Sequence, residues 1–248
     1  IVCHSLCKRA GIAFTPVFQY AFEAPEVVAF IRENYPDVII RKREKSYFQM
    51  IKEKRFLPSN RMRFCCQYFK ENSKDIAVIT GVRREESAGR RGRKMFGIKR
   101  KRDIKKYADI FSADCTETEK SALQLRPILY FSEAEVWRYI KKYGLPYPKL
   151  YDEGLKRCGC MLCPLAQLKP NMFWLKRYPN MLSSFNRNVF AGMQLDRIWN
   201  KGKDSEEDLS NDPYRFLLYW LSSSFRPSKK DRIMIDRFLN EMNETIIY

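Results

Sequence analysis

Two pairs of cysteines are the residues of this chain with the clearest chemistry. Cys65 and Cys66 are adjacent in the sequence, and Cys160 and Cys163 form a Cys-x-x-Cys unit much further along. Thiolates are soft ligands, and four of them suit tetrahedral zinc or an iron–sulfur cluster. A zinc ribbon usually repeats the Cys-x-x-Cys unit, whereas adjacent thiols diverge and can reach different iron atoms of a larger cluster. We therefore favour a cluster over zinc, and a site without metal is the remaining alternative.

The other cysteines and the single histidine have simpler interpretations. Cys3 and Cys7 are one helical turn apart and are expected to pack as small apolar residues on a buried helix face. His4 lies between them and is expected to be structural, as is the isolated Cys115. Cys158 lies close to the second pair and is an alternative ligand.

Composition limits the classes of protein to which the chain can belong. The chain has 248 residues, 45% of them hydrophobic, which is enough for one large domain, or a domain with an appendage, around a real core. No uncharged apolar run is long enough to span a membrane. The first residues lack the charged leader of a signal peptide and do not begin with Met, so we expect the chain to start mid-protein. Eight cysteines without a secretion signal indicate a reducing cytoplasm.

The formal net charge of +18 predicts attraction to polyanions such as nucleotides, RNA or DNA. The charge alone does not choose among them, and a well-solvated basic surface is the plainer interpretation.

Helix and strand patterns alternate through the first two thirds of the chain. We predict helices at residues 1–10, from 25, through 48–51, at 64–71 and at 132–144, and strands at 37–40, 75–81 and 125–130. This alternation is typical of βαβ units around a parallel sheet. From residue 171 onward the pattern is helical and aromatic, with an expected loop at 201–213. The aromatic stripe near residues 216–221 is expected to be core, and an interface with nucleic acid or a partner is the alternative.

A basic segment follows the strand predicted at 75–81. Residues 81–93 hold five arginines and three glycines, at the strand end where ligands bind in open parallel sheets. Arginine can bind phosphate oxygens with two hydrogen bonds, and glycine lets the backbone come close. The alternative is a basic loop in which Glu85 and Glu86 pair with neighbouring arginines.

Several short motifs, taken in order, resemble the phosphoadenylylsulfate (PAPS) reductase family of the adenine-nucleotide α-hydrolase superfamily. The resemblance covers residues 1–165. The motifs are Arg63-x-Cys65-Cys66-x-x-x-Lys70, Gly81-x-Arg83-x-x-Glu86-Ser87 with Arg90, Arg126-Pro127-Ile128, Gly144-Leu145-Pro146-Tyr147, Leu150-Tyr151-Asp152 and Gly159-Cys160-x-x-Cys163-Pro164.

The resemblance implies an α/β fold with a Rossmann-like, mostly parallel sheet flanked by helices, which binds an adenine nucleotide. Residues 1–165 would form this domain, and residues 166–248 a helical C-terminal extension. It also implies a [4Fe-4S] cluster held by the four paired cysteines, with Lys70 close to the cluster. The residues expected near the phosphates or the sulfonucleotide are Gly81, Arg83, Glu86, Ser87 and Arg90.

The sequence departs from the family pattern in two places. The family's pyrophosphate loop, a Ser-Gly-Gly-Lys-Asp-Ser-like stretch, would precede residue 1, so we expect weak nucleotide binding by the chain as it stands. True sulfonucleotide reductases also use a redox cysteine near the C-terminus, and no cysteine follows Cys163. The pattern is similar to relatives that use ATP and a cluster in sulfur transfer, such as the DNA phosphorothioation sulfur-transfer proteins.

The sequence therefore predicts a cytoplasmic enzyme of sulfur metabolism. It would bind ATP or a sulfonucleotide beside a [4Fe-4S] cluster and act by sulfonucleotide reduction or by ATP-dependent sulfur transfer. Its other partners would be nucleic acid or a protein that donates sulfur or electrons, with no membrane. The alternative is a non-catalytic, basic nucleic-acid-binding protein with a structural metal site.

Overall fold

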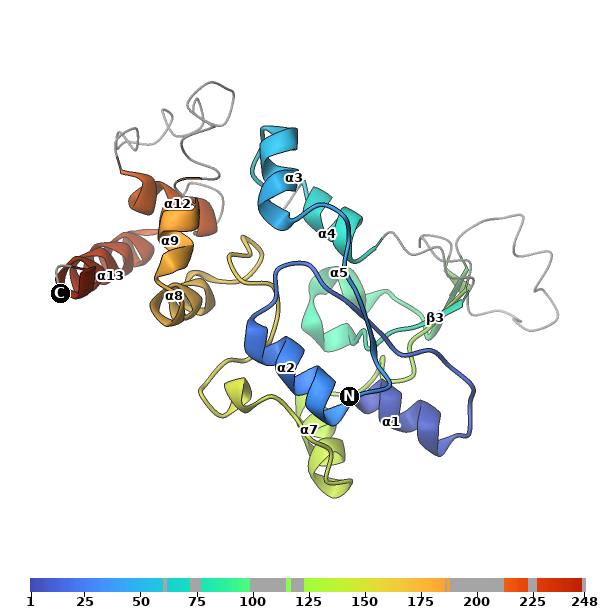
Figure 1. The fold of residues 1–248 in the computed structure, drawn as a ribbon. Coiled ribbons are helices and arrows are strands. Elements are labelled where there is room, and N and C mark those ends of the chain that lie inside the picture. The colour runs from blue at the N-terminus through green and yellow to red at the C-terminus, as the bar shows by residue number, and fades with distance from the viewer. Residues whose placement is uncertain are drawn as a thin grey trace. The chain divides into compact units, whose positions relative to one another are not determined.

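The computed structural model describes residues 1–59, 62–71, 77–98, 115–116, 123–185, 187, 212–222 and 227–246 (Figure 1). The chain divides into two compact units, each built from separate segments. The first contains Ile1–Phe18, Ala29–Arg41 and Lys70–Lys149, and the second contains Gln19–Val28, Lys42–Phe69 and Leu150–Tyr248. The domain boundary predicted between residues 165 and 166 stays a prediction. Within the described ranges, no helix combines the length and the apolar character needed to cross a membrane.

A four-stranded sheet lies in the first unit. Its strands are β3 (Ala77–Ile79), β6 (Leu123–Leu125), β4 (Phe96–Ile98) and β5 (Cys115–Thr116), in the order β3-β6-β4-β5. β3 pairs with β6 and β4 with β5 in parallel, whereas β4 and β6 are antiparallel. With its flanking helices, this mostly parallel sheet confirms the predicted α/β, Rossmann-like fold.

β4 was not predicted, because its short segment carries a central glycine and lacks an apolar run. The structure gives the reason for that glycine. A Cβ at Gly97 would lie 3.1 Å from the Arg126 guanidinium, so the close approach of the two groups favours glycine.

The strand predicted at 125–130 is wrong over most of its length. β6 ends at Leu125, and the next residues form turns, with the Leu129 N–H donating to the Arg126 carbonyl at 3.1 Å. Pro127 has no N–H for a strand ladder, which opposes strand continuation. Arg126 is fully buried, and its guanidinium donates to the Lys94 carbonyl (2.7 Å) and to Gln124 Oε1 (2.9 Å).

Two helices with well-defined ends pack together in the first unit. α1 (Val2–Arg9) is followed by Gly11 at φ +63°, and α7 (Glu133–Lys142) is followed by Gly144 at φ +56°. The predicted capping box of α7 is present: the Glu135 N–H donates to Ser132 Oγ (3.2 Å), and the Ser132 N–H donates to the Glu135 carboxylate (2.7 Å). Val2, Ile128 and Ile140 form the buried cluster between the two helices.

The short strands β1 (Val17–Gln19) and β2 (Ile39–Arg41) form a second sheet, and α2 (Pro25–Asn34) lies between them in the sequence. β2 begins two residues after the predicted start. Proline at the first position of α2 confirms the helix start predicted there.

His4 belongs to a charged contact in the first unit. Its Nε2 lies 2.9 Å from Asp37 Oδ2, and Lys8 Nζ is also 2.9 Å from that oxygen. The His4 ring packs edge-on against Phe14 and Tyr35. These contacts agree with the structural role expected for His4.

We expect Asp37 to make the stability of the protein depend on pH under acidic conditions. Hydrogen bonds from Lys8 and His4 lower its pKa to about 2, below its usual value. The carboxylate therefore stabilises the fold above about pH 4, and this contribution is lost as the pH falls towards 2. Because its side chain is 38% exposed, we expect less than about 1 kcal/mol. Urea titrations at pH 6 and pH 3 should show a smaller pH-dependent loss for Asp37→Asn than for the wild type, and identical losses would contradict this prediction.

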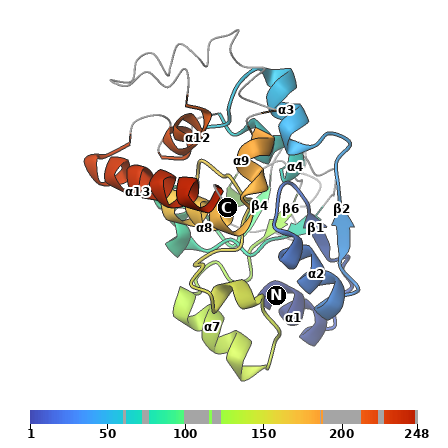
Figure 2. The same ribbon diagram turned by 60° about the vertical axis from the view of Figure 1, so that its left-hand side comes forward.

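The second unit is mainly helical. α3 (Tyr47–Lys54) begins at a capping box between Ser46 and Gln49, and α4 (Phe64–Phe69) follows it. Later in the chain come α8 (Leu168–Arg177), α9 (Asn180–Phe185), α12 (Pro213–Leu221) and α13 (Lys229–Ile246). Figure 2 shows these four helices gathered together, with α8 packed against α9, α12 and α13.

α12 forms the core of these C-terminal helices. All six residues from Phe216 to Leu221 are at most 1% exposed, which confirms the expectation that the aromatic stripe is core. The Asp212 carboxylate accepts the N–H groups of Tyr214 and Arg215, and Pro213 opens the helix. Pro213 is therefore helical and not part of the predicted loop, whose residues 201–211 lie outside the described ranges.

Candidate metal centre and anion-binding turn

The structure brings the two cysteine pairs close together. Cys65 and Cys66 lie in the first turn of α4, Cys160 and Cys163 precede α8, and all four belong to the second unit. The pKa of the Cys65 thiol is raised, first by its hydrogen bond with Cys66, then by burial, and then by the charges of Cys66, Cys163 and Cys160. These thiols are thus near enough to affect one another's ionisation. Within the described ranges, no three His, Cys, Asp or Glu side chains meet the geometry for holding one metal ion.

The Cys160–Cys163 loop has an unusual backbone conformation. Leu162, between the two cysteines, is fully buried and adopts φ +48°, a left-handed conformation that is unfavourable for leucine. Its carbonyl accepts a hydrogen bond from the Tyr47 hydroxyl (3.2 Å), and the Met161 N–H donates to the Phe22 carbonyl (2.8 Å). Contacts with α3 and with the segment before α2 therefore help to hold the curled loop.

An aromatic wall lies beside this loop. The rings of Phe22 and Tyr47 are stacked, with centroids 5.2 Å apart, and Phe48 meets both of them edge-on. Burial, and then the charges of all four paired cysteines, raise the pKa of Tyr47 well above its usual value. The four thiols thus lie near the Tyr47 hydroxyl, which its buried surroundings keep neutral.

Glu23 is a buried carboxyl group that contacts the second cysteine pair. Its side chain is 2% exposed, its Oε2 accepts the Ala21 N–H (2.7 Å), and its Oε1 accepts from the Cys160 thiol at 3.3 Å. Glu23 and Cys160 also form an isolated antiparallel bridge. Sequence reasoning missed Glu23, because nothing in its local pattern marks it as distinct from a surface glutamate.

Cys158, the alternative ligand, contacts Tyr151. Burial raises the pKa of Cys158 to about 11, and a hydrogen bond with Tyr151 partly opposes that shift. Burial likewise raises the pKa of Tyr151 to about 12. Cys158 therefore has a partner of its own in the second unit.

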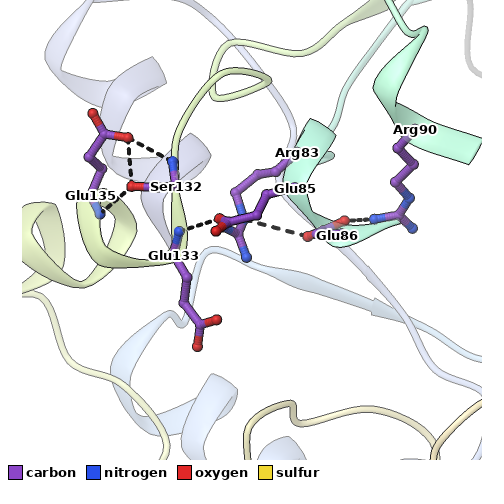
Figure 3. A network of polar contacts seen from close by, with 7 residues as sticks. All are labelled: Arg83, Glu85, Glu86, Arg90, Ser132, Glu133 and Glu135. Atoms are coloured by element: carbon purple, nitrogen blue, oxygen red, sulfur yellow. Dashed lines mark hydrogen bonds and ion pairs between the residues drawn. The ribbon is translucent and has the colours of Figure 1, made fainter. Parts of the chain in front are cut away.

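The predicted anion-binding residues from Gly81 to Arg90 follow β3 in one segment of the first unit, and Figure 3 shows Arg83, Glu86 and Arg90. The turn contains η1 (Arg84–Glu86) and the short α5 (Ala88–Arg91). Arg83 Nε lies 3.6 Å from Glu86 Oε1, and Arg90 forms an ion pair with the same carboxylate. The structure thus brings together Arg83, Glu86 and Arg90.

Glu85 anchors this turn to α7. Its Oε2 accepts the Glu133 N–H at 2.6 Å, at the helix start where N–H groups lack partners within the helix, and it also contacts Arg83 Nη1 at 3.0 Å. The pairing of glutamates with arginines, weighed from the sequence as the alternative to phosphate binding, is therefore present. The Arg83 side chain is only 15% exposed, whereas that of Arg90 is 31% exposed. Arg90 is thus the more accessible of the two cations.

The contacts of Arg84, Ser87 and Gly81 differ from those of Arg83 and Arg90. The Arg84 guanidinium donates two hydrogen bonds to the Arg93 carbonyl and lies over the Tyr130 ring. These contacts hold the Arg84 side chain in place. The Ser87 side chain does not cap α5, and a Cβ at Gly81 would make only ordinary contacts.

Lys70, predicted to lie near the cluster, directly follows α4 and is exposed.

Comparisons with known proteins extend these observations. The family model described as the phosphoadenosine phosphosulfate reductase domain matches residues 23–166, more than half of the chain. An adenosine 5'-phosphosulfate reductase 2 of Bacillus subtilis is 24% identical over 173 residues, which are 66% of each chain. An adenosine 5'-phosphosulfate reductase of Bacillus cereus is 27% identical over 168 residues, 63% of each chain.

An uncharacterised protein of Methanocaldococcus jannaschii is 28% identical over 174 residues, 66% of this chain and 32% of the relative. The matches therefore span about a third of the archaeal relative and slightly less than two thirds of the bacterial reductases.

Proposed function

This chain belongs to the phosphoadenosine phosphosulfate reductase family, and from that membership we propose that it is a sulfur-metabolism enzyme that reduces a sulfonucleotide. The substrate class is adenosine 5'-phosphosulfate or its 3'-phosphorylated form. An external dithiol supplies two electrons and becomes a disulfide. The bond between the sulfate sulfur and the phosphate oxygen breaks, and sulfite and the adenosine phosphate leave.

The second part of the proposal is that Cys65, Cys66, Cys160 and Cys163 hold a [4Fe-4S] cluster. The donor set fits: the four thiols are soft ligands, and each is partly buried. The Cys65 thiol forms a hydrogen bond with Cys66, and the charges of Cys160 and Cys163 act on it as well, so both pairs could contribute to one site. Once bound, the cluster would supply a redox-active, charged centre.

The turn after β3 supplies groups for the anionic part of the substrate. Arg90 and Arg83 would donate charge-assisted hydrogen bonds to phosphate or sulfate oxygens, and the Ser87 hydroxyl would add another donor. Glu86 holds both guanidinium groups in place, and an incoming anion must compete with it. Lys70 would contribute a further positive charge.

The observation that carries the proposal is that four free, partly buried thiols from two distant parts of the chain belong to one compact unit. The chain should therefore be brown after anaerobic purification, with absorbance at about 400 nm and about four iron and four sulfide ions per chain. It should also bind adenosine 5'-phosphosulfate in calorimetry.

Other results would contradict this proposal. A colourless protein with one zinc ion per chain and a steep salt dependence of polyanion binding would support the nucleic-acid-binding alternative. A brown protein that consumes ATP but leaves the sulfonucleotide intact would mean that the chain acts by ATP-dependent sulfur transfer and not by reduction.

A further inference from the structure

The side chain of Asn171 pairs with the backbone of Cys163. Asn171 Oδ1 accepts the Cys163 N–H at 2.9 Å, and Asn171 Nδ2 donates to the Cys163 carbonyl at 2.9 Å. Asn171 is fully buried. A carboxamide offers an acceptor and a donor side by side, so it can bind both polar groups of one residue, which neither aspartate nor alanine can do. The contact therefore fixes the backbone from which the Cys163 thiol projects.

Asn171 lies on α8, beyond residues 23–166 that the family model matches. On the same helix, Trp174 and Leu175 are buried, and α8 packs against α9, α12 and α13. At the end of α8, Arg177 contacts Glu26 Oε1 (2.5 Å) and Glu153 Oε2 (2.7 Å). The helix that carries Asn171 is thus held along its length.

The same helical group also contacts the segment that leads to the first cysteine pair. The indole N–H of Trp220, on α12, donates to the Pro58 carbonyl at 2.8 Å. Trp220 is 1% exposed and stacks against Phe185 of α9. Pro58 lies between α3 and α4, and α4 carries Cys65 and Cys66. The C-terminal helices therefore contact Cys163 of the second pair directly and the segment that precedes the first pair.

From these contacts we infer that the C-terminal helices are a clamp that sets the position of the two cysteine pairs, with Asn171 as the positioning residue for Cys163. The inference deepens the proposed function and rests on it where a bound cluster is concerned. The contacts that form the clamp are made within the folded chain and do not require bound iron. Residues outside the matched family segment would then decide how well the site accepts its cluster.

The first test uses the protein without iron. Asn171→Ala should raise the rate at which iodoacetamide alkylates Cys163 by about 5–30-fold, because the Cys163 N–H loses a buried partner and the loop loosens. Mass spectrometry of the peptide would measure that rate, with Cys158 as an internal reference. Asn180→Ala, an exposed asparagine at the start of α9, is the matched control and should leave the rate unchanged.

The second test follows anaerobic reconstitution. Asn171→Ala should bind less iron per chain than the wild type, and the iron that remains should give an altered electron paramagnetic resonance spectrum. Asn171→Asp keeps an acceptor for the Cys163 N–H but places a buried carboxylate against the Cys163 carbonyl, so its loading should also fall. Trp220→Phe removes the hydrogen bond to Pro58 and leaves a small cavity beside Phe185, and it should lower loading without changing the alkylation of Cys163.

Each outcome decides the inference. Wild-type alkylation and loading in a folded Asn171→Ala variant would overturn it. Should that variant fail to fold, Asn171→Asp and Trp220→Phe take its place, and normal loading in both would overturn the clamp. A wild-type chain that binds no cluster would refute the metal proposal, whereas unchanged Cys163 alkylation in folded Asn171→Ala would refute the positioning role alone.

Discussion

Cys160→Ser is expected to remove the iron from the protein, lowering the iron content per chain by more than about tenfold. Serine has nearly the same shape as cysteine, but its hydroxyl does not ionise near neutral pH and is a harder, weaker ligand for iron. The visible absorbance should disappear together with the iron. Iron and sulfide assays on anaerobically reconstituted protein would measure the effect, and circular dichroism would establish that the variant is folded.

Cys158→Ser is the matched control, because the same substitution is made two residues away. Cys158 forms its hydrogen bond with Tyr151, and a serine hydroxyl can replace that bond. This variant should keep the iron and the colour of the wild type. Loss of iron in Cys158→Ser with retention in Cys160→Ser would mean that Cys158 is the ligand, and the assignment of Cys160 would then be wrong.

Arg90→Ala should weaken the binding of adenosine 5'-phosphosulfate by about 10-fold to 150-fold. A charge-assisted hydrogen bond contributes about 1.5–3 kcal/mol, and its loss changes the dissociation constant by that factor. The loss also leaves Glu86 without this ion-pair partner in the turn, and its negative charge then repels the ligand. Calorimetric titration at fixed ionic strength would measure the change, which should shrink as salt is added.

Arg90 is a better choice than Arg83 for this test, because Arg83 also contacts the carboxylate of Glu85, which caps α7. Arg138→Ala is the control: this arginine is exposed on α7 of the same unit, and its removal changes the net charge equally. If both variants weaken binding to the same extent, the effect comes from overall charge, and the turn is not the anion site.

Much of the secondary structure could be predicted from the sequence, because helix starts and ends depend on neighbouring residues. Ser132 with Glu135 and the glycine at 144 mark α7, and Pro25 marks the start of α2. The strand predicted at 125–130 failed because an apolar run does not distinguish a strand from a buried turn. Ile128 and Leu129 are buried because they pack inside the protein, and not because they pair with a neighbouring strand.

The sequence by itself determined the family, the α/β class, and the four thiols and the arginines that a site could use. These features follow from residue types and short spacings. Only the tertiary structure decided which groups surround them: Glu23 beside Cys160, Asn171 against Cys163, and Glu86 between Arg83 and Arg90. The physical reason is that periodicity and spacing report local conformation, whereas Glu23 meets a thiol 137 residues away only after the chain has folded. The chemistry of the thiols can therefore be inferred from the sequence, but the groups that tune them can be identified only from the folded chain.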